Sequence, residues 1–192
     1  MKISAILLAA GQSKRYQGPP KLTVPFQGGP SLLEQQFKLL GQLEVTEKIM
    51  ISNPRTLAGM TNHLPIAASD IKVLINETPQ KGLHSSIRMA IEASSTDTVG
   101  WILWLADLYQ LRQAHFERLL QEIQVGQGRY LTAPAFQGVR GHPVFIPQSH
   151  RSRVLREPDG DHGCRYLWKE ISAEQQCMIN WEDSSILEDF DI

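Results

Sequence analysis

The chain has 192 residues, which suits a single globular domain, because domains usually run to roughly 100–200 residues. Its 19 Lys and Arg nearly balance its 20 Asp and Glu, so no global charge would hold nucleic acid or a membrane, and any anion site must be local. The two cysteines, Cys164 and Cys177, have neither metal-ligand nor disulfide-framework spacing, which favours a reducing, cytoplasmic location.

The first predicted element is a buried strand over Ile3–Leu8, in an apolar run far shorter than the ~20 residues of a membrane span. It leads into Ala9, Ala10 and Gly11, where small side chains allow backbone N–H groups to approach a ligand and form an anion-binding concavity. Arg15 and Lys21 follow in a Gly/Pro-rich turn and could reach the same anion. The alternative is an ordinary turn with solvated cations, because neither a Walker A nor a G-x-G-x-x-G pattern is present.

Further apolar runs and helical patterns alternate along the chain. Ser31 and Glu34 form a capping-box signature that predicts a helix after Pro30. Alternation of strands and helices favours parallel βαβ units in an α/β fold with a doubly wound sheet, spanning 1–192 as one domain. The other predicted strands are Lys48–Ser52, Lys72–Ile75, Val99–Leu105, Tyr130–Ala133 and Pro143–Ile146, with helical patterns after Gly82, around Phe116 and over Gly163–Glu170.

Asp107 directly follows the most apolar predicted strand, Val99–Leu105. In a doubly wound sheet it would lie at the carboxyl edge, where ligands bind. A carboxylate there is a natural Mg²⁺ ligand, since Mg²⁺ takes one or two carboxylates and completes its shell with water and phosphate oxygens. The alternative is that Asp107 caps the next helix.

The residues that carry these patterns resemble the MobA-like nucleotidyltransferase family. "LLAAGQSKRYQGPPKL" is similar to the family's L-A-A-G-x-S-x-R-[MF]-G-x-x-K signature, and Asp107 matches the Asp of its G-D-x-P segment. "KGLHSSI", "RGHPVFI" and "GDHGCR" resemble three later family motifs in the same order. The Ala-Ala-Gly form resembles the CTP-using branch, molybdenum cofactor cytidylyltransferases, rather than the GTP-using branch.

The resemblance implies a Rossmann-like, mostly parallel sheet of the nucleotide-diphospho-sugar transferase type. It also implies transfer of a nucleoside monophosphate, CMP from CTP, to a phosphorylated acceptor of the molybdopterin kind, with Mg²⁺ as cofactor and pyrophosphate released. Arg15, Lys21 and Asp107 take the catalytic roles, with Asp107 on the metal. The implied nucleotide-binding residues are Leu8, Ala9, Ala10, Gly11, Arg15, Lys21, Gly82, Ser85 and Ser86.

For the acceptor, the resemblance implies binding by His142, Asp161 and Arg165. His142 could instead be a catalytic base or have a structural role, although a phosphate nucleophile needs no base at neutral pH. Ser85 or Ser86 could be a helix N-cap. Cys164 is not expected to be a nucleophile, because the family motif has Ala at this position.

Two parts of the chain depart from the family pattern. Ala106 and the stretch Leu108-Tyr109-Gln110 change the loop around Asp107, and the acidic C-terminal segment reads "INWEDSSILEDF". Asp183 is the expected second metal ligand there, with Asn180 and Glu182 as alternatives. The rival functions are the same chemistry on another phosphorylated acceptor, such as a sugar phosphate, and a catalytically silent nucleotide- or cofactor-binding protein. A molybdoenzyme or its chaperone is a further possible partner; nucleic acid and membrane are not expected.

Overall fold

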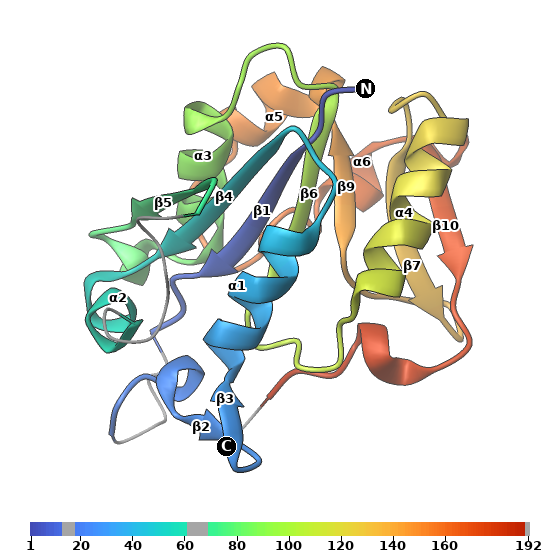
Figure 1. Cartoon of the computed structure of the whole chain (residues 1–192). Helices are drawn as coiled ribbons and strands as arrows, with labels where there is room; N and C mark the ends of the chain where they lie inside the picture. Colours follow the sequence, from blue (N-terminus) through green and yellow to red (C-terminus); the bar gives the residue numbers. More distant parts are fainter. Residues whose placement is uncertain (13–17, 61–68, 191–192) are drawn as a thin grey trace.

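The structure, a computed structural model, describes residues 1–12, 18–60 and 69–190. In these residues an eight-stranded sheet forms the centre, and a two-stranded hairpin stands apart from it (Figure 1). The strands are β1 (Ser4–Ala9), β2 (Pro25–Phe26), β3 (Gly29–Ser31), β4 (Glu47–Ser52), β5 (Ile71–Ile75), β6 (Gly100–Leu105), β7 (Leu131–Phe136), β8 (Val139–Arg140), β9 (Val144–Pro147) and β10 (Gln176–Asn180). The α-helices are α1 (Leu32–Gln42), α2 (Pro54–Met60), α3 (Leu83–Ala93), α4 (Gln113–Val125), α5 (Arg151–Arg156) and α6 (Leu167–Glu170).

The central sheet has the strand order β10-β7-β9-β6-β1-β4-β5, and β8 pairs with β7. Strands β1, β4, β5 and β6 are parallel, and so are β7 and β10. Strand β9 is antiparallel to both of its neighbours, β6 and β7. The expected mostly parallel, doubly wound α/β sheet is confirmed.

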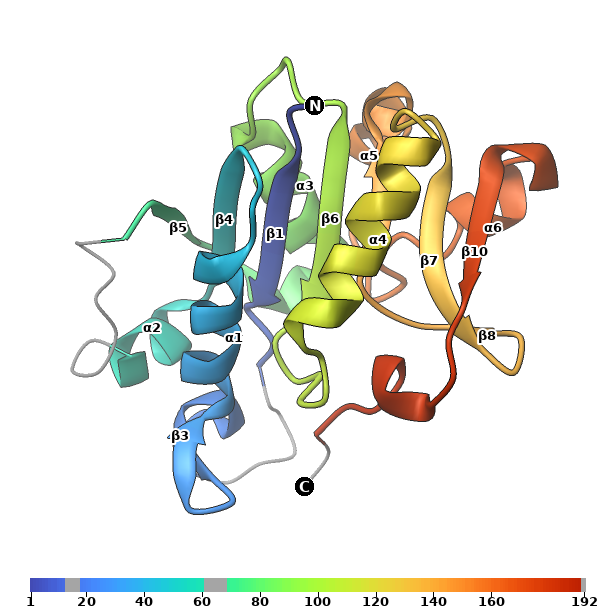
Figure 2. The same cartoon turned by 45° about the vertical axis from the view of Figure 1, so that its right-hand side comes forward.

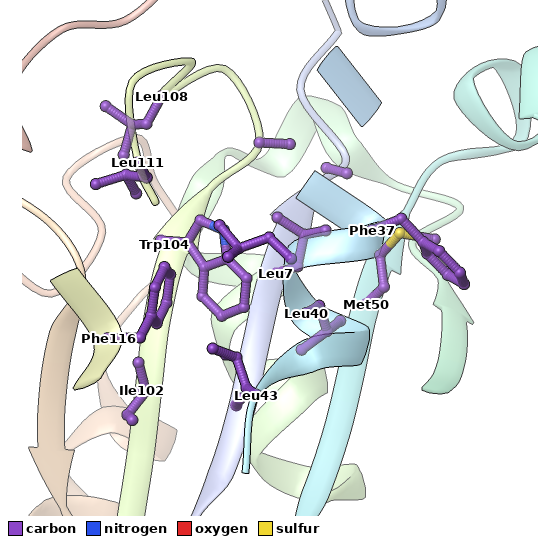
Figure 3. Packing of buried hydrophobic residues seen from close by; sticks show 14 of the residues in the cluster. Leu7, Phe37, Leu40, Leu43, Met50, Ile102, Trp104, Leu108, Leu111 and Phe116 are labelled. Atoms are coloured by element: carbon purple, nitrogen blue, oxygen red, sulfur yellow. The ribbon is translucent and has the colours of Figure 1, made fainter. Parts of the chain in front are cut away.

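Helices cover both faces of the sheet, with α1 and α4 on one face and α3 and α5 on the other (Figures 1 and 2). Successive side chains of a strand point to opposite faces of the sheet, so a strand that is apolar throughout contributes to the core on both faces. In β1, Leu7 packs into the cluster under α1 and α4, and Ile6 packs into the cluster on the other face, under α3 and α5. Trp104 and Phe116 meet edge to face under α4, with ring centroids 4.7 Å apart (Figure 3). In the described part of the chain, no helix combines the length and hydrophobicity needed to cross a membrane.

The predicted elements are found close to their expected positions. Helix α1 begins with the expected capping box, in which Ser31 Oγ accepts from the Glu34 N–H and Glu34 Oε2 accepts from the Ser31 N–H. Strand β7 continues beyond the predicted Ala133 to Phe136, where it pairs with β8. The last predicted helix is shorter than expected and is regular only over α6. The strands and α-helices without a sequence prediction are the β2–β3 hairpin, α2, β8, α5 and β10.

Candidate active site

The carboxyl ends of β1, β4, β5 and β6 meet along one edge of the sheet, as their parallel pairing requires. The ends of β6 and β1 are joined directly, because the Ala106 N–H donates to the Leu8 carbonyl at 3.0 Å. The side chains of Leu8, Ala9 and Ala10 are buried, so only their main chain can meet a ligand. Gly11 is the first exposed residue after the strand, and no described atom lies within 4 Å of where its Cβ would be. Arg15 lies outside the described residues.

Lys21 and Asp107 meet at this edge, although they are far apart in the sequence. The Lys21 Nζ donates to Asp107 Oδ2 at 3.1 Å. Their side chains are only 16% and 24% exposed, so solvent screens the pair less than it would on the open surface. Lys21 also donates to the main-chain carbonyl of Phe190 at 2.7 Å. The structure thus brings together the two described residues expected to act in catalysis.

Asp107 is not a helix cap, because α4 starts at Gln113 and its N-cap is Arg112. A buried glutamine holds the Asp107 loop from the core: Gln36 Nε2 donates to the Leu108 carbonyl at 3.2 Å and Gln36 Oε1 accepts from the Trp104 indole at 2.9 Å. Leu108 packs into the same apolar cluster as Trp104 (Figure 3). Asp107 Oδ1 is buried and has no hydrogen-bond partner among the described residues.

Asn53, at the carboxyl end of β4, is a residue that the sequence analysis missed. Its Nδ2 donates to the carbonyls of Ala10 and Gly11 at 3.0 and 3.2 Å, and its Oδ1 accepts from the Thr56 N–H at 2.8 Å. Asn53 therefore caps α2 and at the same time fixes the backbone that follows β1. An Asn after a strand and before Pro54 is a helix-start signal that could have revealed it.

Gly82, Ser85 and Ser86 lie at the start of α3. The N-cap is Gly82, so the alternative that Ser85 or Ser86 caps this helix is wrong. Instead, Asn76 at the end of β5 donates to Ser85 Oγ at 3.0 Å and to Ser86 Oγ at 2.9 Å. Asn76 is buried and was also missed, and it holds the expected nucleotide-binding serines in place.

Residues 160–163 pack on the N-terminus of α3. The Leu83 N–H donates to Asp161 Oδ1 at 3.2 Å and the His84 N–H donates to the Gly160 carbonyl at 2.9 Å, so this segment satisfies helix-start donors. The two nitrogens of the buried His84 ring lie 2.9 Å from the carbonyl oxygens of Gly163 and Val154. The loop expected to bind the acceptor is thereby joined to the loop expected to bind the nucleotide.

The charges of Asp107 and Arg165 both act on the pKa of His142. Burial lowers the pKa of His142, the Leu103 carbonyl and Asp107 oppose this shift, and Arg165 adds to it. The ring Nδ1 is 3.4 Å from the Leu103 carbonyl oxygen. The lowered pKa favours a neutral imidazole at His142.

The contacts of Asp183 are those of a local cap. Its Oδ1 accepts from the Ser185 N–H at 2.9 Å, at the start of the short 3-10 helix Ser184–Ile186. Hydrogen bonding to Ser185 lowers the pKa of Asp183, helped by the charges of His115 and Arg112. A metal-binding role for Asp183 stays a prediction.

Cys164 has the properties of a packing residue. Burial, with a smaller effect of the Glu157 charge, raises the pKa of its thiol to about 12, so the thiolate is scarce at neutral pH. This agrees with the expectation that Cys164 is not a nucleophile.

Comparison with known proteins identifies the family. Residues 5–176 match the MobA-like NTP transferase domain. The chain belongs to this family. Membership supports a nucleotidyltransferase of MobA-like type, which binds an NTP and a phosphorylated acceptor. A curated relative, nicotine blue oxidoreductase from Paenarthrobacter nicotinovorans, is 25% identical over 198 residues, covering 98% of this chain and 92% of the relative.

Solved structures show the same fold. Rv0371c from Mycobacterium tuberculosis H37Rv superposes with a TM-score of 0.77 at 20% identity, covering 95% of this chain and 89% of that one, and it has also been crystallised with manganese. The 4-diphosphocytidyl-2C-methyl-D-erythritol synthase from Anaerococcus prevotii gives 0.71 at 13% identity over 96% of this chain and 89% of its own. This MobA-like chain thus shares the nucleotide-diphospho-sugar transferase fold.

Proposed function

We propose that this MobA-like protein transfers CMP from CTP to a phosphorylated acceptor of the molybdopterin kind and releases pyrophosphate. The observation that carries the proposal is the Lys21–Asp107 ion pair at the carboxyl edge of the sheet, the same edge at which the exposed Gly11 follows β1. Nucleotidyl transfer needs a cation to neutralise the phosphates and a carboxylate to hold a metal ion, and this pair contains one of each.

Asp107 is the residue suited to hold Mg²⁺. Its Oδ1 is buried and has no hydrogen-bond partner in the described part of the chain, so a ligand atom is available that is now unsatisfied. Residues 1–12, 18–60 and 69–190 contain no group of three or more His, Cys, Asp or Glu side chains that could hold a metal. A site with one carboxylate, completed by water and phosphate oxygens, is the usual form for Mg²⁺.

Bound Mg²⁺ would supply positive charge that offsets the charge developing on the phosphates. The protein's own residues position the reactants. Backbone N–H groups near Gly11, held by Asn53, approach the phosphates, and the Lys21 ammonium neutralises them. An acceptor phosphate oxygen forms a bond to the α-phosphorus as the bond from that atom to the bridging oxygen breaks, and pyrophosphate leaves. The acceptor oxygen is already anionic, so the neutral His142 is proposed to position it rather than to take a proton.

The choice of CTP rests on the resemblance of the Ala-Ala-Gly loop to the CTP-using branch. It is supported by a structural relative whose name is that of a diphosphocytidyl synthase. The choice of Mg²⁺ is supported by the manganese complex of Rv0371c. The binding contacts proposed for Arg15, Ser85, Ser86, Asp161 and Arg165 are those implied by the family motifs.

The direct test is release of pyrophosphate from α-labelled CTP with Mg²⁺ and molybdopterin, by the wild type and by Asp107→Ala. We expect the variant to lose about 10²-fold or more in rate, the usual effect of removing a preorganised electrostatic group. Asp70→Asn is the matched control, because Asp70 also pairs with a lysine, Lys48 at 2.9 Å, but precedes β5 at the opposite edge of the sheet. Equal losses in the two variants would refute the assignment of Asp107.

The substrates are tested in parallel arms. A thermal-shift screen of four NTPs with Mg²⁺ identifies the base, because a tight ligand stabilises the folded state by mass action. Turnover with sugar phosphates but not with molybdopterin would replace the proposed acceptor. CTP binding without any turnover would favour the silent homologue. Oxidoreductase activity, as in the name of the Paenarthrobacter relative, would contradict the proposal, and the chain has no G-x-G-x-x-G dinucleotide motif to support it.

A further inference from the structure

The C-terminal segment 187–190 is bound directly to both residues of the candidate catalytic pair. The Phe190 N–H donates to the main-chain carbonyl of Asp107 at 2.8 Å, and the Phe190 carbonyl accepts from Lys21 Nζ at 2.7 Å. The Phe190 ring meets Phe26 of the β2–β3 hairpin edge to face, with centroids 5.0 Å apart. Figures 1 and 2 show the chain after β10 forming a short helical turn and then running past the loop that follows β6.

Glu188 ties the same segment to the Asp107 loop. Glu188 Oε2 accepts from the Tyr109 hydroxyl at 2.9 Å and also from the Gln110 amide. Its other oxygen, Oε1, accepts from Ser184 Oγ at 2.6 Å. One carboxylate therefore joins the loop after β6 to the last turn before the C-terminal segment. Hydrogen bonds from Ser184 and Tyr109 lower the pKa of Glu188, so it is ionised at neutral pH.

Two of the backbone hydrogen bonds within the Asp107 loop are long. The Leu108 N–H to Leu105 carbonyl and the Leu111 N–H to Leu108 carbonyl distances are both 3.3 Å, near the long end for N–H···O bonds. On the core side, Gln36 holds the Leu108 carbonyl. On the outer side, the side chains of Tyr109 and Gln110 both bind Glu188.

We propose that Glu188 is a positioning residue for nucleotidyl transfer, which holds Asp107 and Lys21 in place through Tyr109 and the backbone of Phe190. This inference rests on the proposed function for its catalytic consequence, but the structural link itself does not. Glu188 touches neither of the two catalytic side chains in the described contacts, so it acts on them through the loop and the segment.

The structural link is tested by amide hydrogen exchange of the full chain without any substrate. Glu188→Ala is expected to raise the exchange rate of peptides covering 106–112 about tenfold or more, the effect of losing a hydrogen bond to a charged group. Asp189→Asn is the control, since it removes an exposed carboxylate next to Glu188 and is expected to leave this exchange unchanged. Unchanged exchange in Glu188→Ala, or the same increase in both variants, overturns the inference.

The catalytic consequence is tested by steady-state kinetics with CTP and Mg²⁺. Glu188→Ala is expected to lower kcat about 10- to 100-fold, while KM for the nucleotide changes less than about threefold, because misplaced catalytic groups affect the reaction more than binding. Glu188→Gln keeps one carbonyl acceptor, for Tyr109 and Gln110, and its NH2 group can donate to Ser184 Oγ, so it should recover part of kcat. A rise in KM alone, or no recovery by Gln, overturns the positioning role. If the wild type transfers no nucleotide, the proposed function fails, and the exchange experiment still decides whether Glu188 holds the loop.

Discussion

Gly82→Ala is expected to destabilise the protein because Gly82 combines an unusual backbone conformation with a close backbone contact. Its φ of 94° and ψ of 174° lie in a region that only glycine adopts readily, and another residue there costs about 1–3 kcal/mol. A Cβ would lie 2.4 Å from the Gly160 carbonyl carbon and 2.8 Å from the Asp161 nitrogen, and overpacking adds about 1–3 kcal/mol. We expect a total loss of about 2–6 kcal/mol in the free energy of unfolding.

The assay is urea denaturation, supported by thermal melting. The loss corresponds to a decrease of about 4–24 °C in Tm for a chain of this size. Gly138→Ala is the matched control: Gly138 also has a positive φ, +81°, but no described atom lies within 4 Å of its Cβ position. The control should lose only the conformational part, about 1–2 kcal/mol. If the two variants are equally stable, the close contact between Gly82 and residues 160–161 is not as described.

Three further substitutions probe the framework of the site by the same urea assay. Gln36→Leu leaves the buried indole N–H of Trp104 unpaired and leaves the Leu108 carbonyl only its long bond from the Leu111 N–H, so a loss of about 1–3 kcal/mol is expected, and a neutral result would refute the bridge. Ser31→Ala removes the capping-box acceptor of α1 and should cost about 1 kcal/mol; an unchanged midpoint would contradict this. Burial lowers the pKa of His115, so its stabilising contribution is complete above its ordinary value of 6.5 and is lost as the pH falls below it. His115→Gln should therefore reduce the decrease in stability between about pH 7 and pH 5, by at most about 1.4 kcal/mol per pH unit; an unchanged slope would count against it.

The sequence was sufficient for the elements that carry strong local signals. Strands β1, β4 and β6 are buried along almost their whole length, so each contains an apolar run that shows in the sequence. Strand β5 lies at the sheet edge and is only partly buried, but its Val73–Ile75 stretch is also apolar. Strand β10 lies at the sheet edge, and in its sequence QCMIN only Ile179 is buried, so neither an apolar run nor a clear alternation is present. Helix α2 is short, and its signal is confined to the cap at Asn53.

The site residues that could be predicted from the sequence are those whose own charged side chain is suited to the chemistry. Lys21 and Asp107 were expected from the charge and from the strand ends, and the structure brings them together. Asn53 and Asn76 act through hydrogen bonds to other residues, and an isolated Asn in a sequence does not show its partner. Phe190 contributes main-chain atoms, which are the same in every residue, so its contacts with Lys21 and Asp107 have no sequence signal.

The reversed direction of β9 has a consequence for how the two halves of the site can vary. A parallel strand delivers to the carboxyl edge the residues that follow it, as β1 and β6 do with Gly11 and Asp107. Strand β9 runs the opposite way beside β6, so it delivers the residues that precede it, including His142. The proposed nucleotide-binding residues thus follow the carboxyl ends of strands, whereas His142, in the proposed acceptor site, precedes the amino end of β9. Substitutions in the residues before β9 could therefore alter the choice of acceptor. The loops that follow β1 and β6, and with them nucleotide binding, would remain unchanged.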